Sequence, residues 1–216
     1  MPQNSLPVLA RALPIAGLFA LLAVFAWPVR ADLYLAVAPA VAGSAAASVV
    51  ADVASYGLLA LVALAGLLAL WSLVRDRAAF WRLVCGGVGA IIAYVISEAV
   101  KLLVSEERPC RVWDVATALA CPEVGDWSWP SNHSVLAAAF ATSCIVSVPR
   151  TAWFAVPAAL LVGVSRLAAG VHYLHDVASG FALAVLLVSL FVVLLRPAVG
   201  RLPRSWTSPQ LRDHES

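Results

Sequence analysis

Residues 165–176 read SRLAAGVHYLHD, and they bring an arginine, two histidines and an aspartate into a chain that is otherwise mostly apolar. Ionisable side chains near membrane depth are costly and usually functional. His172 and Asp176 are four residues apart, so on a helix they share one face, where the carboxylate can orient the imidazole. Such a pair is typical of an activated nucleophile or general base. A bend at Gly170 would return the Arg166 guanidinium to the same place, where it would suit a phosphate.

A structural alternative is open for this stretch, in which Arg166 and Asp176 form only an ion pair at the membrane edge. His175 directly precedes Asp176 and faces away from the side that His172 and Asp176 share, so we expect it at the surface.

The composition places the chain outside the soluble globular class. Of the 216 residues, 62% are hydrophobic and 12% are charged, which is typical of a membrane protein. The length suffices for about six membrane helices of roughly 20 residues each. A net charge of +2 gives no indication of nucleic-acid binding. We therefore expect one all-α integral membrane domain over residues 1–216.

The apolar runs predict the individual spans. Residues 31–56 are diluted by polar residues, so we read them as an outside loop or a surface-lying helix, with an extra span as the alternative. The first run could instead be a cleaved signal peptide. The six predicted spans are residues 13–28, 57–74, 83–104, 133–148, 153–168 and about 174–195, and residues 196–216 form a tail.

The basic residues predict the orientation of the bundle. With the N-terminus inside, nine of the 14 basic residues fall on the cytoplasmic side, as the positive-inside rule requires. The C-terminus is then also cytoplasmic, and residues 105–132 and 166–176 share the outer face. These nine residues are Arg11, Arg75, Arg77, Arg82, Arg150, Arg196, Arg201, Arg204 and Arg212.

Two further clusters reach the same face. The only lysine, Lys101, stands seven residues before Arg108-Pro109, and the two cations could bind a phosphate as a point charge and a planar fork. Alternatively, Lys101 only extends to the headgroups. Ser131 and His133 begin the fourth span, where a helix N-terminus attracts anions. Ordinary helix capping by Ser131 or Asn132 is the other interpretation. Glu98, one turn before Lys101, is expected to tune the lysine.

In order and spacing, these clusters resemble the three motifs of the type 2 phosphatidic acid phosphatase (PAP2) superfamily. The patterns are K-x6-R-P, P-S-x-H and S-R-x5-H-x3-D, and they cover residues 101–176. The middle motif is usually P-S-G-H, and Asn132 replaces its glycine here. The resemblance implies a six-helix bundle with a PAP2/haloperoxidase-like core.

The resemblance also implies a role for each matching residue. His172 would be the nucleophile that forms a phosphohistidine, Asp176 would hold it, and His133 would protonate the leaving oxygen. The phosphoryl oxygens would be bound by Lys101, Arg108, Ser131 and Arg166. Three fixed cations can stabilise a transferring phosphoryl group without a metal, so we expect neither a metal nor another cofactor.

A site at the membrane boundary predicts a lipid phosphate as substrate. The chain resembles bacterial undecaprenyl-diphosphate phosphatases, which implies a polyprenyl diphosphate, cell wall biogenesis and the cell membrane. Phosphatidylglycerophosphate or phosphatidate is the alternative substrate, and a lipid phosphotransferase is the alternative enzyme. A transporter would distribute its charges through the bilayer, whereas here they cluster at one edge. No obligate protein partner is inferred.

The four cysteines divide into two kinds. Cys85 and Cys144 lie in apolar runs, where cysteine usually behaves as a small hydrophobic residue. Cys110 and Cys121 lie in the polar loop that the topology places outside, in an oxidising compartment. We therefore predict a disulfide between Cys110 and Cys121, which would hold Arg108 in position.

Overall fold

The computed structural model describes residues 6–199 and 201, and all regular elements in this part of the chain are helical. Arg204 and Arg212, which we predicted on the cytoplasmic side, lie outside the described residues. In chain order the elements are α1 (Leu6–Ala26), α2 (Arg30–Ala42), α3 (Ala47–Arg75), α4 (Arg77–Val104), α5 (Pro109–Val112), α6 (Asn132–Ser147), the 3-10 helix η1 (Pro149–Thr151), α7 (Ala152–Ala168) and α8 (Leu174–Val199).

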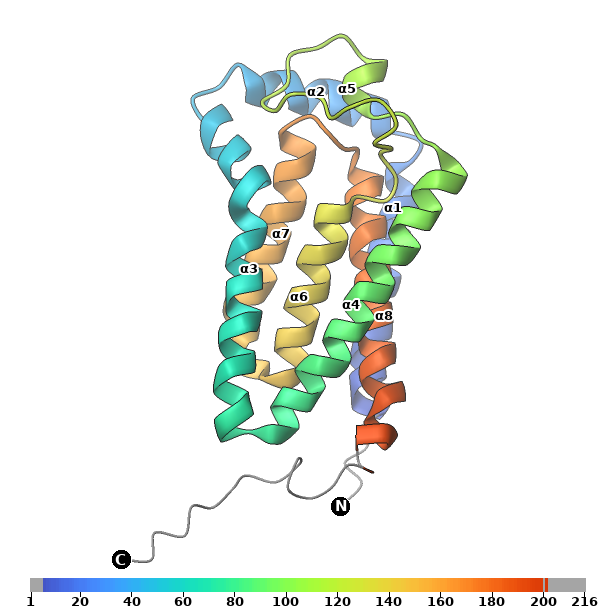
Figure 1. The fold of residues 1–216 in the computed structure, drawn as a ribbon. Coiled ribbons are helices and arrows are strands. Elements are labelled where there is room, and N and C mark those ends of the chain that lie inside the picture. Colours follow the sequence, from blue (N-terminus) through green and yellow to red (C-terminus); the bar gives the residue numbers. More distant parts are fainter. Residues whose placement is uncertain (1–5, 200, 202–216) are drawn as a thin grey trace, which may run out of the picture.

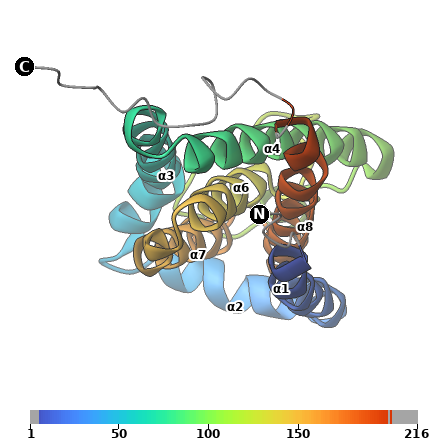
Figure 2. The ribbon, with the colours of Figure 1, turned by 90° about the horizontal axis from the view of Figure 1, so that it is seen from below.

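Helix α6 is at the centre of the bundle. It packs against α3, α4, α7 and α8, and the view along the bundle shows these helices around it (Figure 2). Helix α1 lies outside this core along α8, where the Phe19 and Phe181 rings meet edge to face with centroids 5.0 Å apart. The central helix therefore begins at the end of the bundle that carries the predicted motifs (Figure 1).

Among residues 6–199 and 201, five helical segments are long and apolar enough to cross a membrane by length and composition. They contain the predicted spans at 57–74, 83–104, 153–168 and 174–195, and the first of them, Pro7–Ala26, covers the predicted span 13–28 except for its last two residues. The sixth predicted span, 133–148, corresponds to α6, which is apolar but has only 16 residues, fewer than the roughly 20 that a bilayer requires. The six-span count therefore stays a prediction at α6.

Residues 31–56 are divided between two elements. Helix α2 lies across the end of the bundle (Figure 1), and its Tyr34 and Ala38 pack with Trp113 and Val115 of the long loop, as a surface-lying helix would. Residues from Ala47 onward instead extend α3, so the reading of 47–56 as a loop is wrong. The Tyr34 hydroxyl donates to the Gly170 carbonyl at 3.1 Å, which fixes α2 over the turn between α7 and α8.

Small residues set the spacing of helices next to the motifs. A Cβ atom added at Gly180 of α8 would lie 2.9 Å from the Ser131 carbonyl oxygen and 3.0 Å from the Ser134 Cβ. Only glycine allows this approach, and membrane helices commonly use small residues for this purpose. The start of α6 is thereby held against α8, where the Ser131 amide donates to the Asp176 carbonyl at 3.1 Å.

Gly170 ends α7 and forms the turn that leads to His172. Its φ of +82° is in the left-handed region, and a Cβ atom there would lie 2.6 Å from Thr117 Cγ2. Both the backbone conformation and the packing therefore require glycine.

We expect Gly170→Ala to lower stability and to displace His172. The left-handed conformation alone costs a non-glycine residue on the order of 1–3 kcal/mol. The measurement is the midpoint of thermal unfolding in detergent, together with turnover. Gly66→Ala is the control, because Gly66 is inside α3 and a Cβ there has no neighbour within 4 Å. Equal midpoints for the two variants would contradict this reading of Gly170.

Candidate active site

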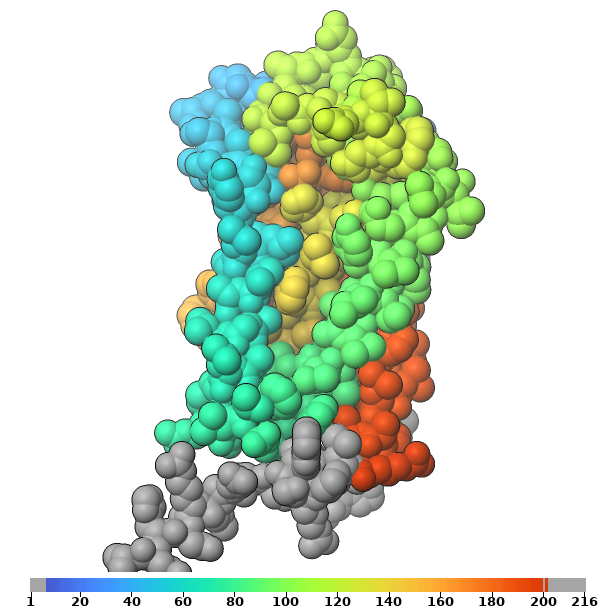
Figure 3. Space-filling view, in the orientation of Figure 1, coloured from blue at the N-terminus to red at the C-terminus, as the bar shows by residue number. Residues whose placement is uncertain are grey.

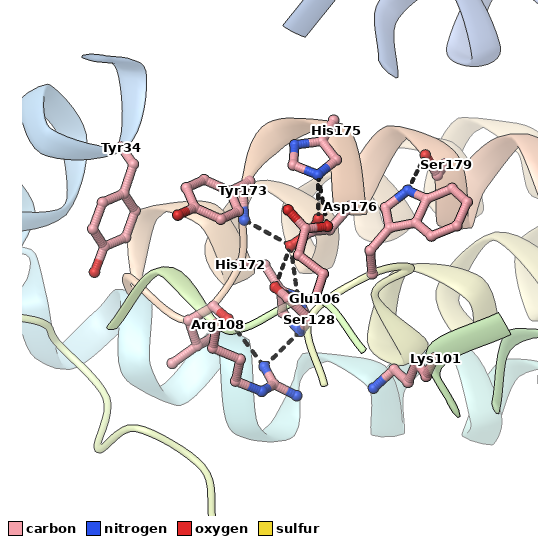
Figure 4. Close-up of polar contacts among 12 residues, drawn as sticks. Tyr34, Lys101, Glu106, Arg108, Ser128, His172, Tyr173, His175, Asp176 and Ser179 are labelled. Atoms are coloured by element: carbon pink, nitrogen blue, oxygen red, sulfur yellow. Dashed lines mark hydrogen bonds and ion pairs between the residues drawn. The ribbon is translucent and has the colours of Figure 1, made fainter. Parts of the chain in front are cut away.

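The seven predicted site residues come from six separate parts of the bundle and gather at one end. Lys101 is in the last turn of α4, Arg108 precedes α5, and Ser131 and His133 are at the start of α6. Arg166 is in the last turn of α7, His172 is in the turn that follows, and Asp176 is in the first turn of α8. All are buried except His133, which is half-buried. Several of these side chains are drawn in Figure 4.

The His172 imidazole is oriented by Asp176. Its Nδ1 lies 3.2 Å from Asp176 Oδ2, and the same carboxylate oxygen accepts from the Tyr173 backbone amide at 2.8 Å. This amide contact is half of a helix capping box, in which the side chain of the third helical residue accepts from the backbone amide of the N-cap residue. In α8 these residues are Asp176 and Tyr173. His172 itself precedes α8, so the start of this helix holds the pair, rather than a shared helical face.

Ser128 is a member of the site that sequence reasoning missed. It is fully buried, and its Oγ donates to Asp176 Oδ2 at 2.6 Å and lies 3.4 Å from His172 Nδ1. The serine is three residues before the P-S-x-H serine, and no spacing rule applied to the sequence would have selected it. It supplies another donor that keeps Asp176 in place.

The nucleophilic nitrogen of His172 would be Nε2. With Nδ1–H donating to Asp176, the Nε2 lone pair accepts from Arg108 Nη1 at 2.9 Å. Complete burial lowers the pKa of His172 to about 3, and the hydrogen bond to Asp176 raises it by less. The imidazole is therefore neutral at pH 7, with its lone pair directed toward a guanidinium.

Arg108 and Lys101 are linked by an acidic residue, Asp126, which sequence reasoning also missed. Asp126 Oδ1 lies 2.9 Å from Arg108 Nη2 and 3.3 Å from Lys101 Nζ. Arg108 also donates to the carbonyls of Asp126 and Val171, at 2.7 Å and 3.0 Å. Partial burial raises the pKa of Asp126, but the hydrogen bond and charge of Arg108 and the charge of Lys101 outweigh burial and lower it. Asp126 is thus an anion at pH 7.

Arg166 and Ser131 retain polar atoms that could bind a ligand. Arg166 Nη1 donates to the Ala54 carbonyl at 3.0 Å, and its buried Nε has no hydrogen-bond partner. In the described contacts Arg166 makes no ion pair with Asp176, so the membrane-edge pairing is wrong. Ser131 is the N-cap residue of α6 but its side chain makes no capping bond, and the buried Oγ has no partner. The positive charges of Arg166, Arg108 and Lys101 all act on the His133 ring.

Asn132, which replaces the usual glycine of the middle motif, is tied to α4. Its amide nitrogen donates to Glu98 Oε1, and its carbonyl oxygen accepts from Ser97 Oγ at 2.7 Å. Asn132 therefore does not cap α6. Glu98, which we expected to tune Lys101, accepts a hydrogen bond from this asparagine.

His175 is buried, so our expectation of a surface position is wrong. Its Nε2 lies 3.1 Å from Glu106 Oε2 and 3.0 Å from Asp176 Oδ1. The Trp27 ring packs edge to face against the imidazole, with the ring centroids 4.6 Å apart. The segment before Arg108 and the end of α1 cover it, which one-dimensional spacing cannot show. Glu106, His175 and Asp176 each offer one possible metal ligand, and the three ligand atoms lie within 4.8 Å of one another. Among the described residues this group could hold a metal, although the same distances suit ion-paired hydrogen bonds.

A profile of the PAP2 superfamily matches residues 82–199, which is more than half of the chain. The chain belongs to the PAP2 superfamily. Its fold is similar to that of a transmembrane PAP2-type phosphatidylglycerolphosphate phosphatase from Bacillus subtilis, with a TM-score of 0.57 and 20% sequence identity. That similarity covers 92% of this chain and 98% of the other. The protein is thus a multi-pass integral membrane protein.

Three curated relatives show which PAP2 proteins are similar in sequence. An undecaprenyl-diphosphatase of Sulfolobus acidocaldarius is 31% identical over 44% of this chain and 47% of its own length. Undecaprenyl-diphosphatase BcrC of Bacillus subtilis is 33% identical over 52% of this chain and 59% of its own. A decaprenylphosphoryl-5-phosphoribose phosphatase of Mycolicibacterium smegmatis is 38% identical over 44% and 49%. The chain spans about half the length of these relatives.

In this PAP2 protein Cys110 and Cys121 are joined by a disulfide, with Cα atoms 5.8 Å apart. The bond closes the loop that begins two residues after Arg108. Cys85 and Cys144 are free and buried. Sequence-based topology and the close approach of the two Cα atoms therefore both favour a bridge in the purified protein.

Thiol labelling of the denatured, unreduced protein measures this bridge. We expect two reactive cysteines, Cys85 and Cys144, and a third, Cys121, in a Cys110→Ser variant. Reduction before labelling is the control and should yield four reactive thiols in the unaltered chain. Four thiols without reduction would contradict the disulfide.

Proposed function

We propose that this PAP2 protein is a lipid phosphatase that works through a phosphohistidine on His172. The observation that carries the proposal is the position of His172 Nε2, whose lone pair lies 2.9 Å from a buried arginine while Asp176 holds the opposite nitrogen. A neutral imidazole aimed at a cation is suited to attack a phosphorus atom whose oxygens that cation binds.

In the first chemical step His172 Nε2 forms a bond to phosphorus, and the bond from phosphorus to the leaving oxygen breaks. His133 donates a proton to that oxygen, and Asp176 stabilises the positive charge that develops on His172. The negative charge on the transferring group is balanced by Lys101, Arg108 and Arg166.

In the second step a water oxygen attacks phosphorus and the bond to His172 Nε2 breaks. His133, now neutral, takes the proton of the attacking water, and inorganic phosphate leaves. Ser131 supports both steps, because its buried and unpaired Oγ can donate to a phosphoryl oxygen. Every proton and bond is then accounted for by residues of this chain.

A lipid substrate is supported by the surface beside the site. Leu102 and Leu103 follow Lys101 directly and are 72% and 84% exposed, as expected for side chains that face hydrocarbon. A phosphorylated headgroup can therefore reach the cations while its apolar tail stays in the bilayer. The proposed substrate is a polyprenyl diphosphate such as undecaprenyl diphosphate, since two of the relatives carry that activity in their names.

Phosphate release from purified lipid phosphates in detergent, with EDTA present, tests the function. The panel contains a polyprenyl diphosphate, a polyprenyl monophosphate, phosphatidate and phosphatidylglycerophosphate. We expect turnover with EDTA, greatest on the diphosphate, and none for His172→Ala. Asp176→Asn should reduce the rate on the order of 10³- to 10⁴-fold, as loss of the orienting carboxylate does in other triads.

Arg108→Ala with Arg111→Ala as its control tests the phosphate-binding assignment. Both changes remove a guanidinium close to α5, but Arg111 is exposed and donates to the Pro122 carbonyl, away from His172. Only Arg108→Ala should abolish turnover. Normal activity of His172→Ala or of Arg108→Ala would contradict the proposed mechanism, and labelled-acceptor formation without phosphate release would indicate a phosphotransferase.

The proposed location is a cell membrane, with the site on the extracytoplasmic face and both termini in the cytoplasm. The support is the grouping of basic residues at the opposite end of the bundle, in the turns around Asp76 and Pro149 and at the end of α8 (Figure 1). A reporter fused after Ser216 should then read as cytoplasmic and one inserted near Gly125 as external. Reporters on the same side would contradict this orientation.

A further inference from the structure

Asp126 binds the two cations that the proposed mechanism assigns to the phosphoryl group. Its Oδ1 lies 2.9 Å from Arg108 Nη2 and 3.3 Å from Lys101 Nζ. The side chains of Arg108 and Lys101 are 4% and 5% exposed, whereas that of Asp126 is 49% exposed. A carboxylate that solvent can reach therefore covers two cations that solvent reaches poorly. In Figure 4 the Lys101 side chain is directed toward Arg108.

A phosphoryl oxygen uses the same donors as a carboxylate oxygen, since both are anionic acceptors. A phosphoryl group that binds Arg108 Nη2 and Lys101 Nζ thus has to take over the contacts of Asp126, and two anions on the same donors repel each other. We propose that the Asp126 carboxylate is a built-in competitor for the phosphate subsite. It leaves Lys101 and Arg108 when a phosphoryl group binds and returns to them as inorganic phosphate departs.

The local backbone permits this exchange without movement of the loop. The Asp126 carbonyl accepts from Arg108 Nε at 2.7 Å, and the Ser128 amide donates to the Glu106 carbonyl at 2.8 Å. On the other side, the Asp126 amide donates to the Glu123 carbonyl at 3.2 Å, so the main chain is held both before and after the carboxylate. Rotation about the Cα–Cβ bond of Asp126 is then sufficient to move its carboxylate into solvent, and such rotations in exposed side chains are fast.

The consequence concerns product release, and it rests on the proposed function. Inorganic phosphate is held by the same cations as the transferring group, and burial makes their attraction stronger than at a solvated surface. An internal carboxylate that takes over Arg108 and Lys101 lowers the affinity for the product. Asp126 therefore limits product inhibition, at the expense of some affinity for the substrate phosphate.

Isothermal titration of the full-length protein in detergent with inorganic phosphate tests the inference. Asp126→Asn keeps the size of the side chain and removes its charge, so we expect phosphate to bind on the order of tenfold more tightly than in the unaltered protein. Asp114→Asn is the matched control. Asp114 is an exposed carboxylate of the same loop that is not bonded to Arg108 or Lys101, and its loss should leave the dissociation constant unchanged.

The opposite role gives the opposite result. If Asp126 only positions Lys101 and Arg108, its loss leaves the two cations to repel each other, and phosphate binding weakens or stays the same. Either outcome overturns the proposal. Asp126→Ser provides a second variant in case Asp126→Asn folds poorly, and it is expected to shift the dissociation constant in the same direction.

A double-mutant cycle with Lys101→Met locates the effect at the site. If Asp126 competes through Lys101, the gain from Asp126→Asn shrinks when the lysine is already absent. If Asp126→Asn increases phosphate affinity equally with and without Lys101, the assigned contact between Asp126 and Lys101 is overturned. Hydrolysis of lipid phosphates is measured on the same preparations. Absence of hydrolysis by the unaltered protein contradicts the proposed function. An unchanged phosphate affinity in Asp126→Asn, with hydrolysis present, contradicts only this inference.

Discussion

The Asp176 carboxylate is the group on which the rest of the site depends. It is fully buried, and its Oδ2 contacts the His172 ring, the Ser128 hydroxyl and the Tyr173 amide, while Oδ1 lies 3.0 Å from His175. These contacts join the start of α8 to the turn after α7 and to the loop that precedes α6. An ionised carboxylate can be buried only when such donors replace its water, and loss of one partner of a buried pair costs about 3–5 kcal/mol.

The concentration of positive charge imposes a second constraint. Lys101, Arg108 and Arg166 are all buried near the end of an apolar bundle, where unpaired charge is expensive. Carbonyl oxygens of Ala54 and Val171 and the carboxylate of Asp126 meet part of that requirement. A subsite that stabilises an anionic transition state also attracts an anionic product strongly. An internal anion that exchanges with phosphate reconciles these two demands.

By itself, the sequence determined the class of the protein and the identity of its motif residues. Long apolar runs with few charges have no stable place in water, so the positions of α1, α4, α7 and α8 follow from composition and length. The charged residues that interrupt such runs are costly and therefore conspicuous, which is why Lys101, Arg166 and Asp176 could be selected from sequence. The i, i+4 spacing likewise anticipated that Asp176 would orient His172.

Tertiary structure alone decided the contacts between residues that are distant in the chain. Asp126 and Ser128 are ordinary loop residues in the sequence, and only the folding of that loop onto α4 and α8 brings them to Arg108 and Asp176. His175 became buried because the segment carrying Glu106 covers it. Hydropathy and spacing describe one segment at a time. Electrostatic pairing depends on distances of a few ångströms between segments, and these are set by helix packing and loop closure.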